Sequence, residues 1–258
     1  MRTQPTTVVT VEESTGTAVV RVGDGTRRNA LTTDGWNALH EAVAGLAARE
    51  DLLAVVVRGH GDVFCAGSDL QEWDGADGAT VDASFAAMET ALQAVEAIPV
   101  PTLAAVQGAA TGAGCQLALA CDLQVLARSA RIGMPVARLG ILLSPAFATR
   151  LTMRVGPTLT KDLLYSGRLL GADEAVATGL VGRVVEDADL EDEVDALLAL
   201  WRTQPRSALR AAKSAVDAGL APVTRAAQQV PPTPTSDRHE MPRRVRQFLL
   251  QTQARRTA

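Results

Sequence analysis

Short runs of β-branched and apolar residues alternate with segments of helical periodicity, and this alternation constrains the fold more than any other feature of the chain. The runs 52–59, 102–108 and 122–127 are short enough to be buried strands. The segments between them repeat apolar residues every three or four positions, as amphipathic helices do. Strands that alternate with helices are typical of parallel sheets joined by helical crossovers. The sequence therefore predicts an α/β fold.

The two ends of the chain have different patterns. Two β-branched runs, 7–11 and 17–22, are separated by a turn-prone segment and predict a hairpin. After residue 141 the pattern is helical almost throughout, apart from a strand-like segment at 180–186. A last basic helix is expected at about 242–255, after the breaks made by Pro231, Pro232 and Pro234. We interpret this helix as an arm that docks on a neighbouring subunit.

Length and composition limit the class of protein. A chain of 258 residues with 47% hydrophobic content can bury one sizeable core or two small ones, and we expect one domain with a terminal appendage. No stretch of eighteen apolar residues is present, and the N-terminus lacks the basic-then-apolar order of a signal peptide, so we expect a cytoplasmic protein with no membrane partner. The three cysteines have no metal-ligand spacing, and neither a disulfide nor a metal site is predicted.

Charge is distributed unevenly along the chain. Residues 201–258 carry eleven Lys or Arg against three Asp or Glu, whereas the whole chain has a net charge of −4. A basic C-terminal region can attract an anionic partner. Aromatic residues make up only 3% of the chain, and no basic-aromatic platform for nucleic acid is present. The sequence therefore favours a phosphorylated small molecule over a nucleic acid.

Two glycine-bearing loops, 64–70 and 108–117, each follow a predicted strand. Gly67 and Gly112 permit backbone conformations in which consecutive N–H groups point outward. Gly112 also precedes a predicted helix, whose N-terminus carries partial positive charge. Short glycine loops are often ordinary turns. The presence of two such loops favours an oxyanion hole.

Five segments of the chain form a specific pattern: RRNAL (27–31), VVVRGHGDVFCAGSDL (55–70), PTLAAVQGAATGAGCQLALACDLQVLA (101–127), MPVARLGI (134–141) and GLVGRVV (179–185). In their order and spacing, the sequence resembles the crotonase (enoyl-CoA hydratase/isomerase) superfamily over about three quarters of its length. The resemblance implies a spiral core of ββα turns over residues 1–195 and a helical C-terminal trimerisation and closing region over 196–258. It also implies a homotrimer or a dimer of trimers.

The resemblance assigns roles to particular residues. The oxyanion-hole donors would be the backbone N–H groups of Ser68 and Ala113. Coenzyme A would bind as part of an acyl-CoA substrate, with no tightly bound cofactor. The positions that match its binding residues are Arg27, Ala66, Gly67, Ser68, Asp69, Leu70, Gly112 and Phe248.

The chain departs from the family at the positions that carry out hydration. Hydratases use two glutamates as an acid–base pair, and here those positions are Gln116 and Val136. Neither side chain transfers a proton at useful pH. Ser144 lies where hydrolases and dehalogenases of the family have a catalytic Asp, but a helix N-cap before Pro145 is an equally good interpretation.

Two hypotheses for function follow. In the first, the chain is an enzyme of lyase or isomerase type, in fatty acid metabolism, that stabilises a thioester enolate. Decarboxylation, C–C cleavage or a substrate-assisted reaction then fits better than hydration. In the second, it is a catalytically silent paralogue that binds acyl-CoA. Fold alone does not separate the two.

Overall fold

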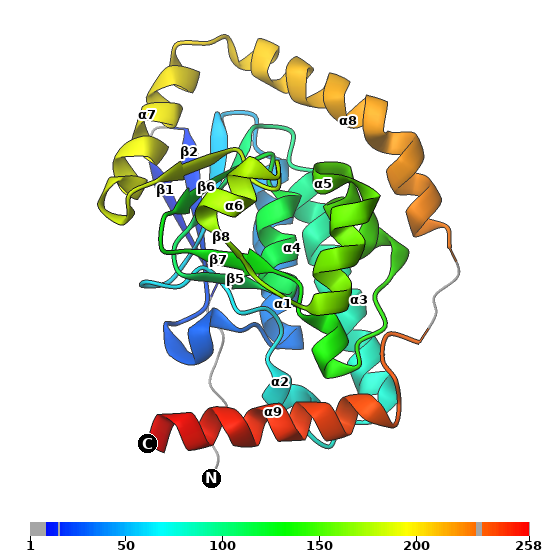
Figure 1. Ribbon diagram of the computed structural model, residues 1–258. Coiled ribbons are helices and arrows are strands. Elements are labelled where there is room, and N and C mark those ends of the chain that lie inside the picture. The colour runs from blue at the N-terminus through cyan, green and yellow to red at the C-terminus, as the bar shows by residue number, and fades with distance from the viewer. Residues whose placement is uncertain (1–8, 15, 231–233, 258) are drawn as a thin grey trace.

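The computed structural model describes residues 9–14, 16–230 and 234–257 and has two β-sheets surrounded by helices (Figure 1). The larger sheet has the strand order β1-β2-β3-β4-β6-β9. Strands β1 and β2 form the expected antiparallel hairpin, and every other pairing in this sheet is parallel. Residues 7 and 8 of the predicted hairpin lie outside the described residues. The strands are β1 (Val9–Ser14), β2 (Thr17–Val22), β3 (Ala54–Gly59), β4 (Thr102–Val106), β6 (Leu123–Ala127) and β9 (Arg183–Val185).

A smaller sheet, in the order β5-β7-β8, begins just after the predicted strand 102–108, within the second glycine loop. The predicted strand 102–108 ends at Val106, and the chain turns at Gly108, which has φ +61°. A Cβ at Gly108 would lie 2.4 Å from the carbonyl oxygen of Asp62, so a side chain has no room there. The strands are β5 (Ala109–Thr111), β7 (Arg131–Gly133) and β8 (Leu170–Gly171).

Helices cover both faces of the larger sheet, because its parallel strands are apolar on both sides. In β3, Val55 and Val57 belong to the main core with α1 (Thr33–Ala47) and α3 (Gly78–Glu96). Val56 points to the opposite face and packs in a second cluster under α7 (Leu190–Arg202). This alternation is the period of two that a strand imposes.

Helices make up most of the chain after residue 141, as the sequence predicted. In α8 no residue is buried, and Figure 1 shows this helix arching over the outside of the molecule. The proposed domain boundary at residue 195 falls inside α7. The remaining helices are α2 (Leu70–Trp73), α4 (Ala113–Ala120), α5 (Pro145–Ser166), α6 (Ala172–Ala177), α8 (Arg206–Gln228) and α9 (Glu240–Thr257), with a 3-10 turn, η2, at Val136–Leu139.

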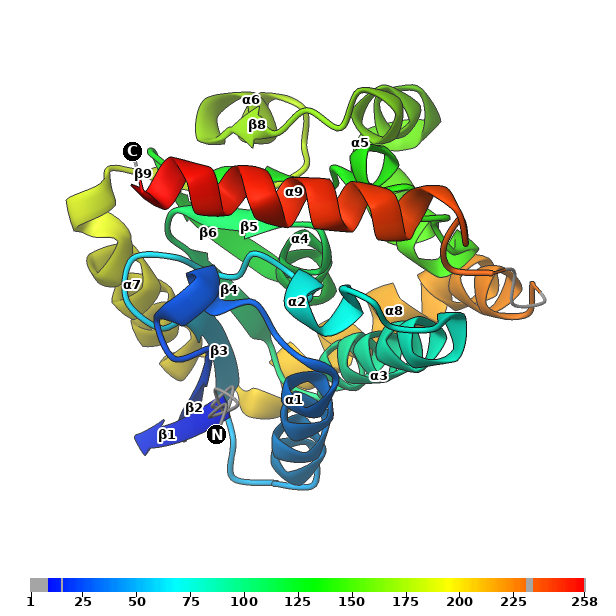
Figure 2. The same ribbon diagram turned by 90° about the horizontal axis from the view of Figure 1, so that it is seen from below.

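The prediction that the last helix lies outside the core is wrong, because the first turns of α9 pack in the core of their own chain. Its docking on a neighbouring subunit stays a prediction. Helix α9 crosses the body of its own chain beside α2 (Figure 2). Met241 and Val245, four residues apart on one helix face, are buried in the main core. Pro231 and Pro232 of the predicted break lie outside the described residues.

Within the described ranges, none of the helices combines the length and the apolar character needed to cross a bilayer.

Candidate active site

The two glycine loops meet, as the sequence predicted, at the start of α4. Cys65 donates its N–H to the carbonyl oxygen of Ala109 at 2.9 Å, and Thr111 donates to that of Cys65 at 3.0 Å. Gly67 has φ +98°, and a Cβ there would lie 2.9 Å from the backbone nitrogen of Ala113. Only glycine permits this close approach of the two loops.

The N–H groups of Ser68 and Ala113 are available at this junction. In the described part of the chain, neither N–H donates a hydrogen bond to another protein group. Ala113 is the first residue of α4, so its N–H lies at the partially positive end of the helix. The preceding Gly112 has φ +58° and donates to the carbonyl oxygen of Gly133 at 2.9 Å, which anchors the loop. Together these groups form a candidate oxyanion hole.

A strained loop before α1 supports the oxyanion loop from the other side. Arg27, Arg28 and Asn29 all have positive φ, at 45°, 57° and 57°. Asn29 is buried and donates from Nδ2 to the carbonyl oxygens of His60 and Val63 at 2.9 and 2.6 Å. The carbonyl of Arg28 in turn accepts from the N–H of residue 66 at 2.9 Å. Strain of this kind is found mainly at functional sites.

Arg27 and Asp69 of the predicted coenzyme A strip bind each other. Their side chains form an ion pair at 2.9 Å, and Arg27 also donates to Oε1 of Gln71 at 2.9 Å. Asp69 is buried and caps α2 by accepting from the backbone N–H of Gln71 at 3.0 Å. Its carboxylate therefore braces the loop. Ala66, Ser68 and Leu70, by contrast, are partly exposed beside it.

Gln116 lies in the helix that begins at the candidate oxyanion hole, and Val136 follows Gly133, whose carbonyl oxygen anchors Gly112, by three residues. Gln116 follows Ala113 by three residues in α4, so the two residues share one helix face. Val136 opens the 3-10 turn η2 and retains 8% of its surface exposed. The apolar Val136 has no group that could activate water.

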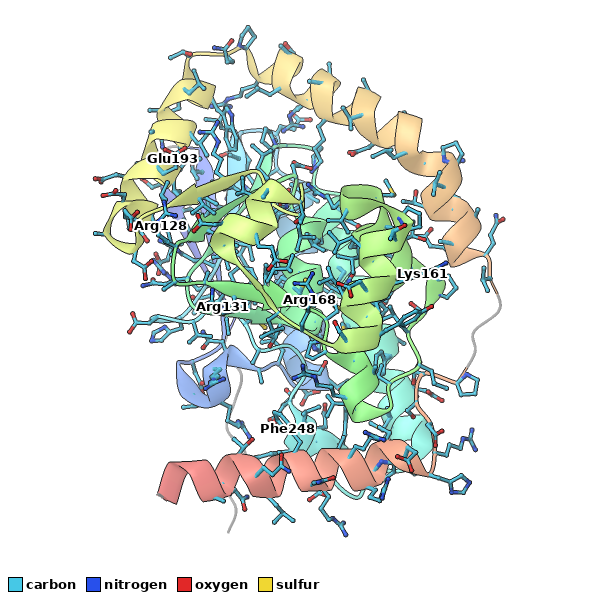
Figure 3. The ribbon with its side chains drawn as sticks, in the orientation of Figure 1. Arg128, Arg131, Lys161, Arg168, Glu193 and Phe248 are labelled. Carbon is cyan, nitrogen blue, oxygen red and sulfur yellow. The ribbon has the colours of Figure 1, made fainter. Side chains whose placement is uncertain are left out.

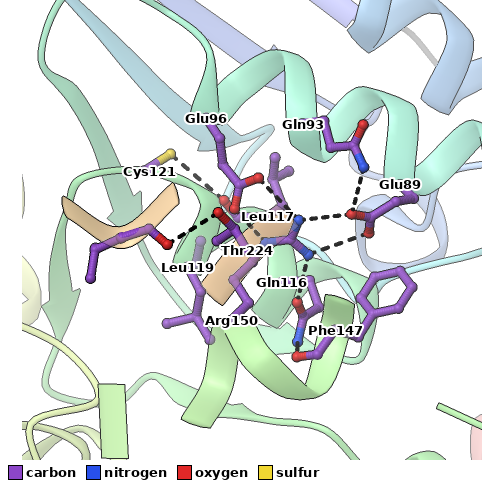
Figure 4. Close-up of polar contacts among 12 residues, drawn as sticks. Glu89, Gln93, Glu96, Gln116, Leu117, Leu119, Cys121, Phe147, Arg150 and Thr224 are labelled. Atoms are coloured by element: carbon purple, nitrogen blue, oxygen red, sulfur yellow. Dashed lines mark hydrogen bonds and ion pairs between the residues drawn. The ribbon is translucent and has the colours of Figure 1, made fainter. Parts of the chain in front are cut away.

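Both the oxygen and the nitrogen of the Gln116 side-chain amide are hydrogen-bonded within the protein (Figure 4). Its Nε2 donates to the carbonyl oxygen of Phe147 at 3.2 Å and to Sδ of Met134 at 3.3 Å. Its Oε1 accepts from Nη1 of Arg150 at 3.0 Å. A carbonyl oxygen can only accept and a guanidinium can only donate, so these contacts fix the orientation of the amide.

Arg150 also pairs with two glutamates of α3, and we call Glu89, Glu96 and Arg150 the Arg150 cluster (Figure 4). Glu96 accepts from Nε at 2.6 Å and from Nη2 at 3.1 Å. Glu89 accepts from Nη1 at 3.4 Å and from Nη2 at 3.1 Å. With Gln116, these bonds engage all five N–H donors of a guanidinium. Burial lowers the pKa of Arg150, but the hydrogen bond and charge of Glu96, with those of Glu89, outweigh burial and raise it above its ordinary value.

Sequence reasoning missed the Arg150 cluster, and it also missed an aromatic group beside it. The ring of Trp73 stacks on Phe85 with centroids 5.2 Å apart, and Phe85 meets the edge of Phe147 at 6.4 Å. Trp73 ends the helix that follows the oxyanion loop, whereas the carbonyl of Phe147 holds Gln116. These aromatic side chains therefore form a continuous contact between the oxyanion loop and the residues that hold Gln116.

Ser144 and the three cysteines lie in surroundings typical of structural residues, not of catalytic ones. The Ser144 hydroxyl caps α5 by accepting from the N–H of Phe147 at 3.4 Å. This contact agrees with the interpretation of Ser144 as a helix N-cap. Burial raises the pKa of the Cys65 and Cys115 thiols to about 12, although backbone hydrogen bonds partly oppose it. Burial likewise raises the pKa of Cys121. Thiols in such surroundings stay protonated and inert.

The basic C-terminal residues are partly neutralised within the chain. Arg243 and Arg244 pair with Glu240, and Arg246 pairs with Asp74 at 3.2 Å. Phe248 lies on α9 and has 47% of its surface exposed (Figure 3). Figure 3 also labels Arg128 and Arg168, both of which pair with acidic residues of the chain.

Comparison with known proteins agrees with this geometry. The family model described as enoyl-CoA hydratase/isomerase matches residues 12–231. The mitochondrial methylglutaconyl-CoA hydratase of Mus musculus is 33% identical over 215 residues, which cover 81% of this chain and 68% of the mouse protein.

Solved structures show the same fold. An enoyl-CoA hydratase/carnithine racemase from Magnetospirillum magneticum has a TM-score of 0.79 and 31% identity, covering 84% of this chain and 82% of its own. An enoyl-CoA hydratase from Bacillus anthracis has a TM-score of 0.79 and 27% identity, covering 96% and 92%. The α/β architecture expected from the resemblance is thus confirmed, and the chain belongs to the enoyl-CoA hydratase/isomerase family of the crotonase superfamily.

Proposed function

We propose that this protein binds an acyl-CoA thioester and holds its carbonyl oxygen between the backbone N–H groups of Ser68 and Ala113. The observation that carries the proposal is a pair of N–H groups, at the junction of the two glycine loops, that have no acceptor among the described residues. Donors fixed in position before the reaction stabilise a thioester enolate without reorganising at the moment of reaction.

The chemistry that fits this site best is not hydration. Water addition requires one group to activate the water and another to deliver a proton, and Gln116 and Val136 do neither. Decarboxylation, C–C cleavage and substrate-assisted reactions need the oxyanion hole but little protein acid–base help. We therefore favour an enzyme of lyase or isomerase type with one of these activities.

A catalytically silent acyl-CoA-binding protein is the second candidate. The carboxylates near the oxyanion loop have other partners, which favours this alternative. Glu72 accepts from the N–H and hydroxyl of Thr33, each at 2.9 Å. The two glutamates of the Arg150 cluster are bound to its guanidinium.

For coenzyme A we propose the strip formed by Ala66, Ser68 and Leu70, with Arg27 and Phe248 at its edges. Arg27 is tied to Asp69 but keeps a partly exposed guanidinium, and Phe248 is exposed on the helix that crosses this region. We also propose a homotrimer or a dimer of trimers. The exposed apolar side chains Val216 and Val223 of α8 support self-association.

The test uses a chromophoric thioester, cinnamoyl-CoA, whose absorbance moves to longer wavelength when its carbonyl is polarised. We expect such a shift on binding to the wild-type protein. Ala113→Pro should abolish it, because proline has no N–H and is tolerated at the first position of a helix. Gly78→Pro, at the first position of α3, is the matched control and should retain the shift. Binding without any shift in the wild-type protein would contradict the proposed oxyanion hole.

A further inference from the structure

The position of Gln116 is built for an uncharged side chain that both donates and accepts hydrogen bonds. Its Oε1 faces a donor, Nη1 of Arg150, and its Nε2 faces an acceptor, the Phe147 carbonyl. A glutamate there could make both contacts only if protonated, since its second oxygen would otherwise meet the carbonyl oxygen at close range. Geometry alone thus favours an uncharged group.

The charge of the Arg150 cluster does not offset the preference for an uncharged side chain at position 116. Arg150 is the nearest positive charge, but Glu89 and Glu96 are both bound to it, so the cluster already has a net charge of −1. Gln116 itself has no exposed surface, and burial disfavours a charged carboxylate. The hydrogen bond from Arg150 would favour ionisation, whereas burial, the Phe147 carbonyl and the two neighbouring glutamates oppose it. We expect the three opposing effects to prevail.

The Gln116 amide retains one hydrogen that a ligand can take over. Its bond to Sδ of Met134 is weak, because a thioether is a poor acceptor. Methionine is unbranched and adaptable, so Met134 can yield to a better acceptor. Gln116 follows Ala113 by three residues, so its side chain lies on the same face of α4 as the first residue of the helix, whose N–H forms part of the candidate oxyanion hole.

We propose that Gln116 is a fixed, uncharged hydrogen-bond donor for an uncharged oxygen on the β-carbon of the acyl group, and that the Arg150 cluster holds it in this role. The inference rests on the proposed binding of acyl-CoA, and it names the substrate class as acyl-CoA thioesters with a β-oxo or β-hydroxy group. Gln116 takes the place of a proton-transferring group by donating a hydrogen bond without releasing the proton.

The electrostatic part is tested without any ligand. In Gln116→Glu, the side-chain carboxyl is followed by carbon-13 NMR as pH changes. The new carboxyl should titrate well above the ordinary glutamate pKa of about 4.3. Adding Glu89→Gln should bring that pKa down, because one opposing charge is removed. Titration of the introduced carboxyl at or below about 4.3 would show that Arg150 dominates and would overturn the inference.

Thermal unfolding gives a second measurement if Gln116→Glu is too unstable for NMR. A carboxyl whose pKa is raised by folding stabilises the fold below its unfolded pKa, and this stability is lost as pH rises through the folded pKa. The difference in Tm between wild type and variant should therefore widen between pH 5 and pH 8. A difference that narrows over this range would overturn the inference.

The substrate contact is tested by calorimetry with two thioesters of equal chain length, acetoacetyl-CoA and butyryl-CoA. Wild-type protein should bind the β-oxo compound about fivefold more tightly, the effect of one ordinary hydrogen bond. Gln116→Met should lose this preference. Gln93→Met is the matched control, because Gln93 donates to Glu89 at 3.1 Å from the far side of the cluster, and it should retain the preference.

The outcomes separate this inference from the proposed function. Equal binding of both thioesters to the wild-type protein would overturn the role of Gln116 and leave acyl-CoA binding intact. If Gln116→Met still bound acetoacetyl-CoA more tightly than butyryl-CoA, the role of Gln116 would likewise be overturned and acyl-CoA binding would stand. Failure of both thioesters to bind would contradict the proposed function itself, and with it the substrate contact.

Discussion

Asn29 holds the loop beside the oxyanion site in a backbone conformation that residues other than glycine rarely adopt. Its side chain bonds four backbone groups, donating to the carbonyls of His60, Val63 and Phe64 and accepting from Gly25 N–H at 2.9 Å. Asn29→Ala should therefore lower the free energy of unfolding by about 2–4 kcal/mol, since buried polar groups lose their partners. Urea denaturation measures the loss.

Thr26→Ala is the control for Asn29→Ala, because Thr26 bonds Asp24 at the exposed edge of the same loop. Because Thr26 lies at the surface, Thr26→Ala should lower the free energy of unfolding by less than about 1 kcal/mol. Equal losses in the two variants would show that Asn29 does not hold the loop.

The cysteines beside the oxyanion loops should be unreactive. Burial raises the pKa of Cys65 and Cys115 to about 12, so almost no thiolate is present at pH 8. Native protein treated with iodoacetamide at pH 8 should remain unlabelled at both residues, and denatured protein should be labelled at both. Rapid labelling of either residue in the native protein would point to thiolate chemistry.

At the residue scale, the sequence predicted local features better than distant contacts. The glycines, Ser68 and Ala113 are identified by short motifs, and their loops meet as expected. Arg150 contacts Gln116, Glu96 and Glu89 across 34, 54 and 61 positions of the chain. No local pattern marks such a set, because turns of three separate helices bring it together.

At the scale of elements, docking of α9 depends on a few apolar side chains among many arginines. Val245→Asp should release the helix, because an unpaired charge would enter the core beside η2. Limited trypsin digestion should then cleave within α9 faster than in the wild-type protein. Leu250→Asp, on an exposed position of the same helix, should leave the cleavage rate unchanged. Equal rates in both variants would contradict this docking.

The error over α9 has a physical origin. Its mean hydropathy is low and its arginines dominate the pattern, so the sequence indicated a solvated arm. The spacing of Met241 and Val245 was the available signal for a buried face. The crossovers were easier to predict, because strands β3, β4 and β6 are short, mostly buried apolar runs and the helix α3 between β3 and β4 is long and amphipathic.

At the scale of the whole molecule, the outer helix α8 should mediate self-association. Val216 and Val223 are 62% and 53% exposed, and they lie on the same side of this helix, seven residues apart. Sedimentation should show a trimer or hexamer for the wild-type protein. Changing both residues to Asp should shift it toward the 27 kDa monomer, whereas Ser214→Asp should not. A wild-type monomer at micromolar concentration would refute this assembly.

The molecule as a whole should polarise an acyl-CoA thioester while lacking the acid–base pair for hydration. The central test is the steady-state rate of crotonyl-CoA hydration. It is measured at a substrate concentration where calorimetry shows binding, and it decides whether the site lacks the acid–base pair. One positioned acid or base contributes about 10²–10⁴-fold, and two that act as a unit do not simply multiply. We expect binding together with hydration several orders of magnitude slower than by a hydratase that has both glutamates. Hydration at the rate of such an enzyme would show that the site holds an acid–base pair after all.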